Sequence, residues 1–315
     1  MTAPRLRTAR APIPARRAGT GGLSAWWLGQ AGFLLEARGT RVLVDAYLSD
    51  TLAEKYRGKP FPHVRMVPPP VDPGALLDVD VVLATHAHTD HLDPGTLGPV
   101  AAANPGCRFV VPASATQVAL ARGVPPDRLV GASAFAPLEV AGVRIHPLPS
   151  AHEQLALDDA GEHKFLGYVL ELGGATVYHP GDCVPYPELP SLLARHAVDL
   201  ALLPVNGRDV RRASSGVPGN FTLDEAMDLA TACRFGAVIG HHYGLFDFNT
   251  IDPADARARI AARAADGAGS ARGRGAGEAR PIDALPPFLL AELGVRYELE
   301  TPAQRDLADH GSATP

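Results

Sequence analysis

Three histidines and one aspartate lie within six consecutive positions in the first third of the chain. The segment Thr85-His86-Ala87-His88-Thr89-Asp90-His91 directly follows the apolar run Val81-Val82-Leu83-Ala84. Neutral imidazole is the commonest side-chain ligand for zinc, and carboxylate oxygen suits harder ions such as manganese. The alternative interpretation, a solvated polar loop, does not explain why four potential ligands follow a buried strand. The segment therefore predicts a metal site, and its mixture of ligands fits a hydrolytic centre.

Short apolar strands are expected to position this loop. Residues 24–28, 32–36 and 41–45 are separated by glycine-bearing turns and predict an antiparallel meander. Residues 79–84 predict the next strand, and Asp93-Pro94 supplies a cap and a first-turn proline for a helix to about Ala103. Further strands are expected at 108–111, 143–148, 167–172, 175–178, 198–203 and 237–240, with helices at 190–196 and 223–233. Two groups of strands with helices outside predict a layered α/β sandwich.

Composition limits the classes of function. The chain has 315 residues, is 46% hydrophobic and carries a formal net charge of -5, which argues against a broad nucleic-acid-binding face. Cys107, Cys183 and Cys233 are too few and too scattered for a disulfide framework, which suits a reducing cytoplasm. No apolar run is long enough to span a bilayer, so we expect no stable membrane association.

The chain is expected to form one domain between flexible ends. Residues 1–21 contain five arginines and no apolar core, and they predict a flexible arm before a domain at 22–300. Residues 261–280 are dominated by alanine, glycine and arginine, which predicts a flexible insertion within that domain. Residues 286–300 regain apolar content and should dock on the domain, whereas 301–315 predict a disordered tail.

Further motifs in a fixed order make the histidine cluster more specific. They are Trp26-Trp27-Leu28-Gly29-Gln30-Ala31-Gly32-Phe33, the run from Val44 to Asp50, Tyr178-His179-Pro180-Gly181-Asp182 and His241-His242-Tyr243-Gly244. With the cluster, they resemble the metallo-β-lactamase superfamily over about residues 22 to 255, and within it the branch that contains L-ascorbate-6-phosphate lactonase. The resemblance implies a four-layer αββα sandwich and a metal-dependent hydrolase.

The same resemblance implies about seven ligands for two divalent ions, zinc or manganese. His86, His88 and His152 would hold the first ion, Asp90 and His91 the second, Asp182 would bridge the two ions, and His242 would be the last ligand. Without the motif order, His152 would be a loop histidine and Asp182 a turn aspartate. His241 and His242 are adjacent, and we select His242 because an aromatic residue follows it, although an exchange of their roles stays open.

Three more residues are expected to support these ligands from behind. Asp45 ends an early strand and resembles the aspartate that supports the metal-binding histidines, and His179 and His241 flank predicted ligands. The other histidines lack such placement and are expected on the surface or in packing roles: His63, His146, His163, His196 and His310.

The expected chemistry is hydrolysis by a metal-bound hydroxide that opens a lactone or related ester of a small polar metabolite, phosphorylated or not. Asp90 and Asp182 are the candidate catalytic residues, and Asp90 would help to transfer the proton. Arg208 and Asn206, in a loop after a strand, are the candidate substrate-binding residues, with a solvated basic loop equally weighted. Tyr56, Arg57 and Lys59 form a weaker candidate cluster at the rim.

Two other functions stay open. A phosphodiesterase of the N-acyl phosphatidylethanolamine phospholipase D type would use the same scaffold, and so would a metal-binding protein without activity. We expect a small-molecule substrate as the partner, and a homo-oligomer is compatible with the sequence. The residues leave the natural substrate, the metal and the oligomeric state open.

Overall fold

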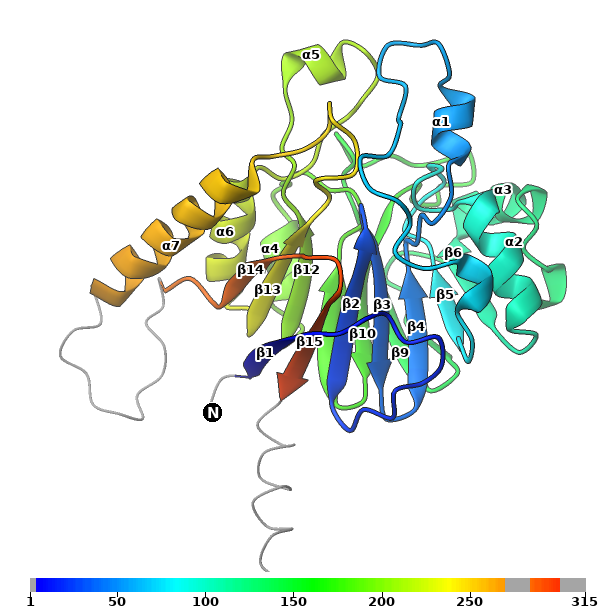
Figure 1. Ribbon diagram of the computed structural model, residues 1–315, viewed down its shortest axis with the longest axis horizontal. Coiled ribbons are helices and arrows are strands. Elements are labelled where there is room, and N and C mark those ends of the chain that lie inside the picture. The colour runs from blue at the N-terminus through cyan, green and yellow to red at the C-terminus, as the bar shows by residue number, and fades with distance from the viewer. Residues whose placement is uncertain (1–3, 270–283, 301–315) are drawn as a thin grey trace, which may run out of the picture.

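Two β-sheets packed face to face form the centre of the molecule in the computed structural model, which describes residues 4–269 and 284–300 (Figure 1). Within those residues the first sheet has eight strands in the spatial order β1 (Arg5–Arg10), β15 (Val295–Glu300), β2 (Leu23–Gly29), β3 (Gly32–Ala37), β4 (Thr40–Val44), β5 (Val81–Leu83), β6 (Arg108–Pro112) and β7 (Leu129–Ala132). The second has seven, in the order β14 (Phe288–Leu290), β13 (Ala237–His241), β12 (Leu200–Pro204), β11 (Ala175–His179), β10 (Leu166–Leu172), β9 (Val143–Pro149) and β8 (Leu138–Val140).

Helices cover the outer face of each sheet, so the predicted four-layer sandwich is confirmed. The helices α2 (Pro94–Ala103) and α3 (Thr116–Ala121) pack on the first sheet. The helices α4 (Leu189–Leu193), α6 (Leu223–Ala232) and α7 (Pro253–Gly269) pack on the second. Two short helices, α1 (Thr51–Lys55) and α5 (Val210–Ala213), lie above the upper edge of the sandwich in Figure 1. Three 3₁₀ turns cover Pro73–Ala75, Ala113–Ala115 and Pro126–Arg128.

Strands buried on both faces explain the continuous apolar runs of the sequence. In β2, Ala25 and Trp27 belong to the hydrophobic cluster between the sheets, whereas Trp26 and Leu28 belong to the cluster beneath α2 and α3. The predicted meander is present, because β2, β3 and β4 pair antiparallel in sequence order. Gly173 and Gly174 form the turn that joins the antiparallel strands β10 and β11.

The carboxyl ends of several strands meet at one edge of the sandwich. In the second sheet, β11, β12 and β13 are parallel, and β9 runs in the same direction because it is antiparallel to β10. The two sheets are joined at this edge, where the Leu166 backbone N–H donates to the Thr85 carbonyl (2.9 Å) and the Tyr168 hydroxyl donates to the Ala84 carbonyl (3.0 Å). The loops that follow β5, β9, β11 and β13 therefore converge.

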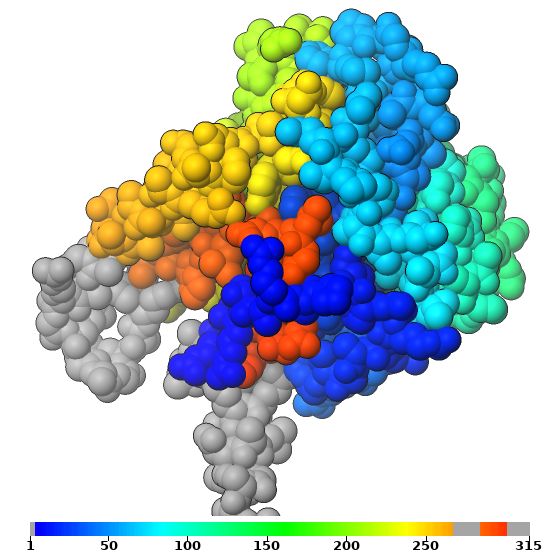
Figure 2. All heavy atoms as spheres, in the orientation of Figure 1, coloured from blue at the N-terminus to red at the C-terminus, as the bar shows by residue number. Residues whose placement is uncertain are grey.

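The prediction of a flexible arm at residues 1–21 is wrong for the described part of that segment. Residues 5–10 form β1, which pairs antiparallel with β15 along its whole length, and Figure 2 shows the two strands in contact. The buried guanidinium of Arg41 donates to the carbonyls of Pro14 and Ala15. Both partners lie far along the chain, so the local sequence could not reveal them.

The prediction of a flexible insertion at 261–280 is wrong for residues 261–269, which complete α7. Alanine and arginine are strong helix formers. Arg259 and Arg263 pair with Asp224 and Asp228 of α6 at 2.5 and 2.6 Å, which fixes the helix against its neighbour. Residues 270–280, and the tail predicted at 301–315, lie outside the described residues. Among those that are described, no helix has the length and apolar content needed to cross a bilayer.

Candidate metal centre

The convergent loops bring all seven predicted ligands together. The loop after β5 supplies His86, His88, Asp90 and His91, and the loops after β9, β11 and β13 supply His152, Asp182 and His242. Their donor atoms form three groups within which every pair lies within 4.8 Å: His86 with His88 and His152, His86 with His91 and Asp182, and Asp90 with His91 and His242. The first group is the ligand set that the resemblance implies for the first ion, and the third joins His242 to the two residues implied for the second.

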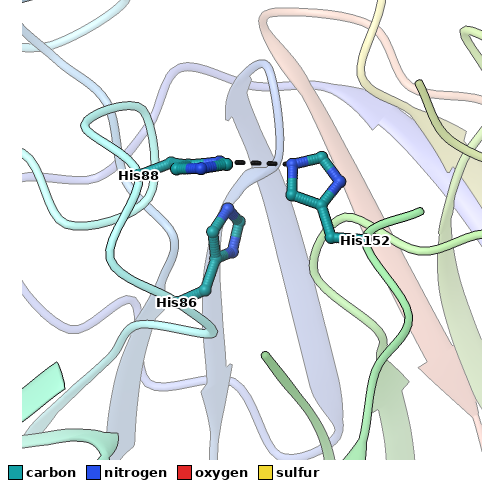
Figure 3. Close-up of side chains that lie close together, drawn as sticks. All are labelled: His86, His88 and His152. Carbon is teal, nitrogen blue, oxygen red and sulfur yellow. Dashed lines mark hydrogen bonds between the residues drawn. The ribbon is translucent and has the colours of Figure 1, made fainter. Parts of the chain in front are cut away.

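Three imidazoles face one another in the first group (Figure 3). Nε2 of His152 lies 3.2 Å from Nδ1 of His88, and the ring of His86 is 4.6 Å from the ring of His88 between centroids. Burial lowers the pKa of His86 and His88, and it lowers the pKa of His152 to about 4. These rings are therefore neutral near pH 7, which is the state that a metal ion requires of an imidazole ligand.

The carboxylate of Asp182 lies between the two ligand sets. Its Oδ2 is 3.5 Å from Nε2 of His152, while its Oδ1 is 2.9 Å from Nε2 of His242 and 3.4 Å from Nε2 of His91. Burial acts to raise the pKa of Asp182, but the charges of His242 and His91 hold it well below its usual value. An ionised carboxylate with one oxygen toward each set has the geometry of a bridging ligand.

Asp45 and Thr85 orient two of the histidines from behind. Asp45 is fully buried and accepts hydrogen bonds from the Thr85 backbone N–H (2.8 Å), the Thr85 hydroxyl (2.7 Å) and Nδ1 of His91 (2.7 Å). The Thr85 hydroxyl oxygen lies 3.1 Å from Nδ1 of His86. In a neutral ring with Nδ1 protonated, Nε2 of His86 and of His91 would direct a lone pair toward the cluster, which is the form that binds a cation. Burial acts to lower the pKa of His91, but the charges of Asp182, Asp45 and Asp90 raise it well above its usual value, so a bound cation would replace the proton on its Nε2. The supporting role expected of Asp45 thus has a defined geometry at His91.

Several buried polar atoms of the cluster have no hydrogen-bond partner in the part of the chain that the structure describes. They include Nε2 of His86, His91 and His242 and Oδ1 of Asp182. His242 Nε2 approaches Asp182 Oδ1 closely, but without the alignment of a hydrogen bond. Each buried polar atom left unsatisfied costs about 1–3 kcal/mol. Cations bound between these atoms would satisfy them. Because the atoms belong to both ligand groups, the donor set fits two divalent ions.

Comparison with known proteins agrees with this site. The family model described as "Beta-lactamase superfamily domain" matches residues 40–243, which is more than half of the chain. This chain belongs to the β-lactamase superfamily. Both its fold and its ligand set are those of a metal-dependent hydrolase, which is the enzyme class of this chain.

Individual relatives are distant but cover most of the chain. A UPF0173 metal-dependent hydrolase of Aeropyrum pernix is 28% identical over 74% of this chain and 88% of its own length. A probable L-ascorbate-6-phosphate lactonase of Escherichia fergusonii is 26% identical over 75% of this chain and 74% of its own. The solved structure of Igni18, a metallo hydrolase from Ignicoccus hospitalis, has a TM-score of 0.58 and 20% identity, and the alignment covers 89% of this chain and 98% of that one. This last likeness supports the fold.

His179 and His241, the two histidines expected to support the ligands, have structural roles. His179 is buried, donates from Nε2 to the Ala31 carbonyl (2.8 Å) and accepts at Nδ1 from the Gly181 N–H (3.0 Å). It therefore fixes the turn that carries Asp182, without bonding the carboxylate itself. The ring of His241 stacks on that of His179, with centroids 5.1 Å apart. His241 belongs to none of the three donor groups, whereas His242 belongs to the third.

Gln30 is a site residue that sequence reasoning missed. It sits in the turn between β2 and β3 at φ 51°, is 1% exposed and donates from Nε2 to Oδ2 of Asp90 (3.1 Å). Its backbone carbonyl accepts from the His242 N–H (3.0 Å), so this one residue positions ligands from both sheets. The sequence signal that could have found it is a glutamine in the turn between two otherwise apolar strands.

The structure does not bring the two predicted substrate residues to the cluster. Arg208 points to α6 and donates from both terminal nitrogens to the carboxylate of Glu225 (2.6 Å each). Asn206 is buried and donates to Oδ1 of Asn249 (2.7 Å), which also accepts from Arg212 (2.6 Å). Asn249 lines the pocket over the ligands, so Asn206 acts behind the pocket wall.

That pocket is small and has a ceiling of its own. It measures about 130 Å³, and its floor includes His88, Asp90, His152, Asp182 and His242. Its ceiling comes from residues 52–63 and 215–218, the segments around α1 and α5, which lie side by side at the top of the molecule (Figures 1 and 2). Of the weaker rim cluster, Tyr56 lines the pocket, and Arg57 and Lys59 do not.

Proposed function

We propose that this metal-dependent hydrolase holds two divalent cations, zinc or manganese, and opens a lactone or related ester of a small polar metabolite. The single observation that carries the proposal is the position of Asp182, with one carboxylate oxygen toward His152 and the other toward His91 and His242. Two cations in such a site lower the pKa of a shared water toward neutrality and polarise the carbonyl oxygen of an ester.

The chain's own residues supply orientation and proton transfer. Asp45 holds His91, and Gln30 holds Asp90, so the donor atoms are fixed before substrate binds. Asp90 lines the pocket and keeps 17% of its side chain exposed. It is therefore placed to carry a proton between the attacking water and the leaving oxygen.

Pocket size and a relative's description support the substrate class. A cavity of about 130 Å³ favours a small metabolite. The description of one relative as a probable L-ascorbate-6-phosphate lactonase makes lactones the first compounds to test. All three cysteines are free, which fits the reducing cytoplasm that we propose as the compartment. No partner other than this small molecule is required.

Asp182→Ala tests the proposal directly. Protein purified without added metal is subjected to elemental analysis, and the same preparation is screened against lactones, carboxylic esters and phosphodiesters. The native chain should bind close to two equivalents of metal and hydrolyse a lactone or ester. Asp182→Ala should bind less than one equivalent and show no turnover. Asp159→Ala, at an exposed position, is the control. A fully metallated, active Asp182→Ala protein would contradict the proposal, and turnover of phosphodiesters alone would replace the substrate class.

A further inference from the structure

The ceiling of the pocket contains an aromatic wall that the ligands do not need. The ring of Tyr56 stacks on His63 with centroids 4.2 Å apart and planes 24° apart. His63 also meets Phe246 and Phe248 at 5.1 and 4.8 Å. Tyr56, His63 and Phe246 all line the pocket. The sequence had suggested only a surface or packing role for His63, because nothing local connects it with the metal-binding loop.

The backbone holds His63 in place at some cost. Phe61 and His63 have φ values of 58° and 55°, a region that side chains other than glycine rarely adopt. Nδ1 of His63 donates to the Phe61 carbonyl (2.6 Å). Burial lowers the pKa of His63 and outweighs the hydrogen bond to the Phe61 carbonyl and the charge of Asp90, both of which raise it. The stacked wall is therefore uncharged near neutral pH and suited to contact with carbon atoms.

A single cation stands beside this wall. Among the described residues that line the pocket, Lys55 is the only lysine or arginine. The Lys55 side chain is exposed, its ammonium lies 5.3 Å from the centroid of Tyr56, and none of the ion pairs in the described part of the chain includes it. The two carboxylates in the pocket, Asp90 and Asp182, belong to the donor groups below. Lys55 thus presents a positive charge that the protein itself leaves without a counter-charge.

We propose that Lys55 binds an anionic group of the substrate, while Tyr56 and His63 pack against its carbon skeleton. The inference rests on the proposed function and narrows it to a small ester or lactone that carries a carboxylate or phosphate away from the reacting carbonyl. It assigns to Lys55 the anion recognition that the sequence had suggested for Arg208, whose guanidinium is engaged by Glu225.

The chain contains a matched control for this lysine. Lys59 lies 5.4 Å from the same Tyr56 ring, nearly the same distance as Lys55, but it does not line the pocket. Lys55→Ala and Lys59→Ala therefore change the net charge and the Tyr56 contact alike. Only Lys55→Ala removes a charge from the pocket.

The test uses the metal-loaded full chain and two esters of equal length, 4-nitrophenyl butyrate and 4-nitrophenyl hemisuccinate, which differ by a terminal carboxylate. For Lys55→Ala, the ratio of kcat/KM for hemisuccinate to that for butyrate should fall about fivefold, through KM, as expected for a partly exposed ion pair of about 1 kcal/mol. Lys59→Ala should keep the native ratio. An unchanged ratio in Lys55→Ala, or the same fall in both variants, would overturn the inference.

A binding measurement separates this inference from the proposed function. Calorimetric titration of the metal-loaded chain with succinate and with butyrate requires no turnover. Lys55→Ala should lose about fivefold in affinity for succinate relative to butyrate, and Lys59→Ala should lose none. If no ester or lactone is cleaved but this loss is seen, the proposed function fails and the anion site stands. If esters are cleaved and succinate binds both variants equally, the anion site fails alone.

Discussion

The guanidinium of Arg208 makes a bidentate ion pair with Glu225, a residue in the first turn of α6. Glu225 accepts from the Thr222 backbone N–H (2.9 Å), and its own N–H donates to the Thr222 hydroxyl (3.3 Å), which completes a capping box. Arg208 donates as well to the Asn220 carbonyl (3.1 Å). Arg208 thus joins the loop after β12 to the first turn of α6, which should contribute to stability.

Arg208→Ala should keep ester turnover and lower stability in a pH-dependent manner. The hydrogen bond from Arg208 is the largest cause that lowers the pKa of Glu225. A carboxyl whose folded pKa is lowered stabilises the protein above its unfolded pKa of about 4.3, and the effect is lost as pH falls through the folded value. Thermal unfolding should show a loss of about 1 kcal/mol or less at pH 7 that shrinks toward zero below about pH 4.

Arg195→Ala, an exposed substitution of the same charge, is the control for this prediction. A variant of Arg208 with native stability and a raised KM would restore the substrate-binding role that the sequence suggested.

Residue types explain which site residues the sequence could reveal. The seven predicted ligands are histidines and aspartates concentrated at the ends of buried strands, where polar side chains indicate a binding site. Lys55 ends the short helix α1 and His63 lies in the loop that follows it, and neither their types nor their spacing distinguishes them from surface residues. The sequence could not show that Arg208 pairs with Glu225, because that partner is 17 positions away and a basic loop has the same sequence whether or not its charge is paired.

At the scale of elements, the turn after β11 determines where Asp182 lies. Gly181 has φ 66°, and a Cβ at that position would come within 2.4 Å of the Thr85 hydroxyl oxygen. Thr85 in turn bonds Asp45 and lies beside Nδ1 of His86. A methyl group at this turn would therefore displace the support of the ligands on the opposite sheet.

Gly181→Ala should lose metal affinity, whereas Gly142→Ala should not. Both glycines have a positive φ, so both substitutions introduce backbone strain of about 1 kcal/mol or more. Only Gly181 has neighbours in the way, because a Cβ at Gly142 meets nothing within 4 Å. Chelator competition measures metal affinity, and thermal unfolding measures the shared strain. Equal metal affinity in the two variants would contradict the role of this turn.

Elements with local signals were predicted, and elements that depend on distant partners were not. Short apolar segments and glycine turns marked β2, β3 and β4, and Asp93-Pro94 marked the start of α2, where the Asp93 side chain accepts from the Gly95 N–H. The register of β1 is set by β15, almost 300 positions later. The composition of α7 was taken for flexibility, since its pairing with α6 cannot be seen along the chain.

At the scale of the whole molecule, the ligands tie the two sheets together. Four come from the loop after β5 in the first sheet, and three from loops of the second. An ion bound between them favours the folded state, because the unfolded chain cannot assemble the same donors. Metal removal should therefore loosen the packing of one sheet on the other.

Chelation should lower the Tm by several degrees. At a free metal concentration about a thousandfold above Kd, binding stabilises the fold by about 4 kcal/mol. Thermal unfolding with excess zinc or manganese is compared with unfolding in a chelator, and Asp182→Ala serves as the control that should show little difference. Identical Tm values for the native chain under the two conditions would indicate that the metal centre does not bridge the sheets.

The position of β15 between β1 and β2 has a consequence for synthesis. Within the described residues β1 pairs with β15 alone, which is synthesised almost 300 positions later, and β2 also acquires one of its neighbours from β15. Residues 5–10 must therefore stay unpaired in the nascent chain until residues 295–300 have emerged. A polypeptide halted before that point would carry the complete histidine cluster on a sheet with an open edge, which chaperones or other nascent chains could bind.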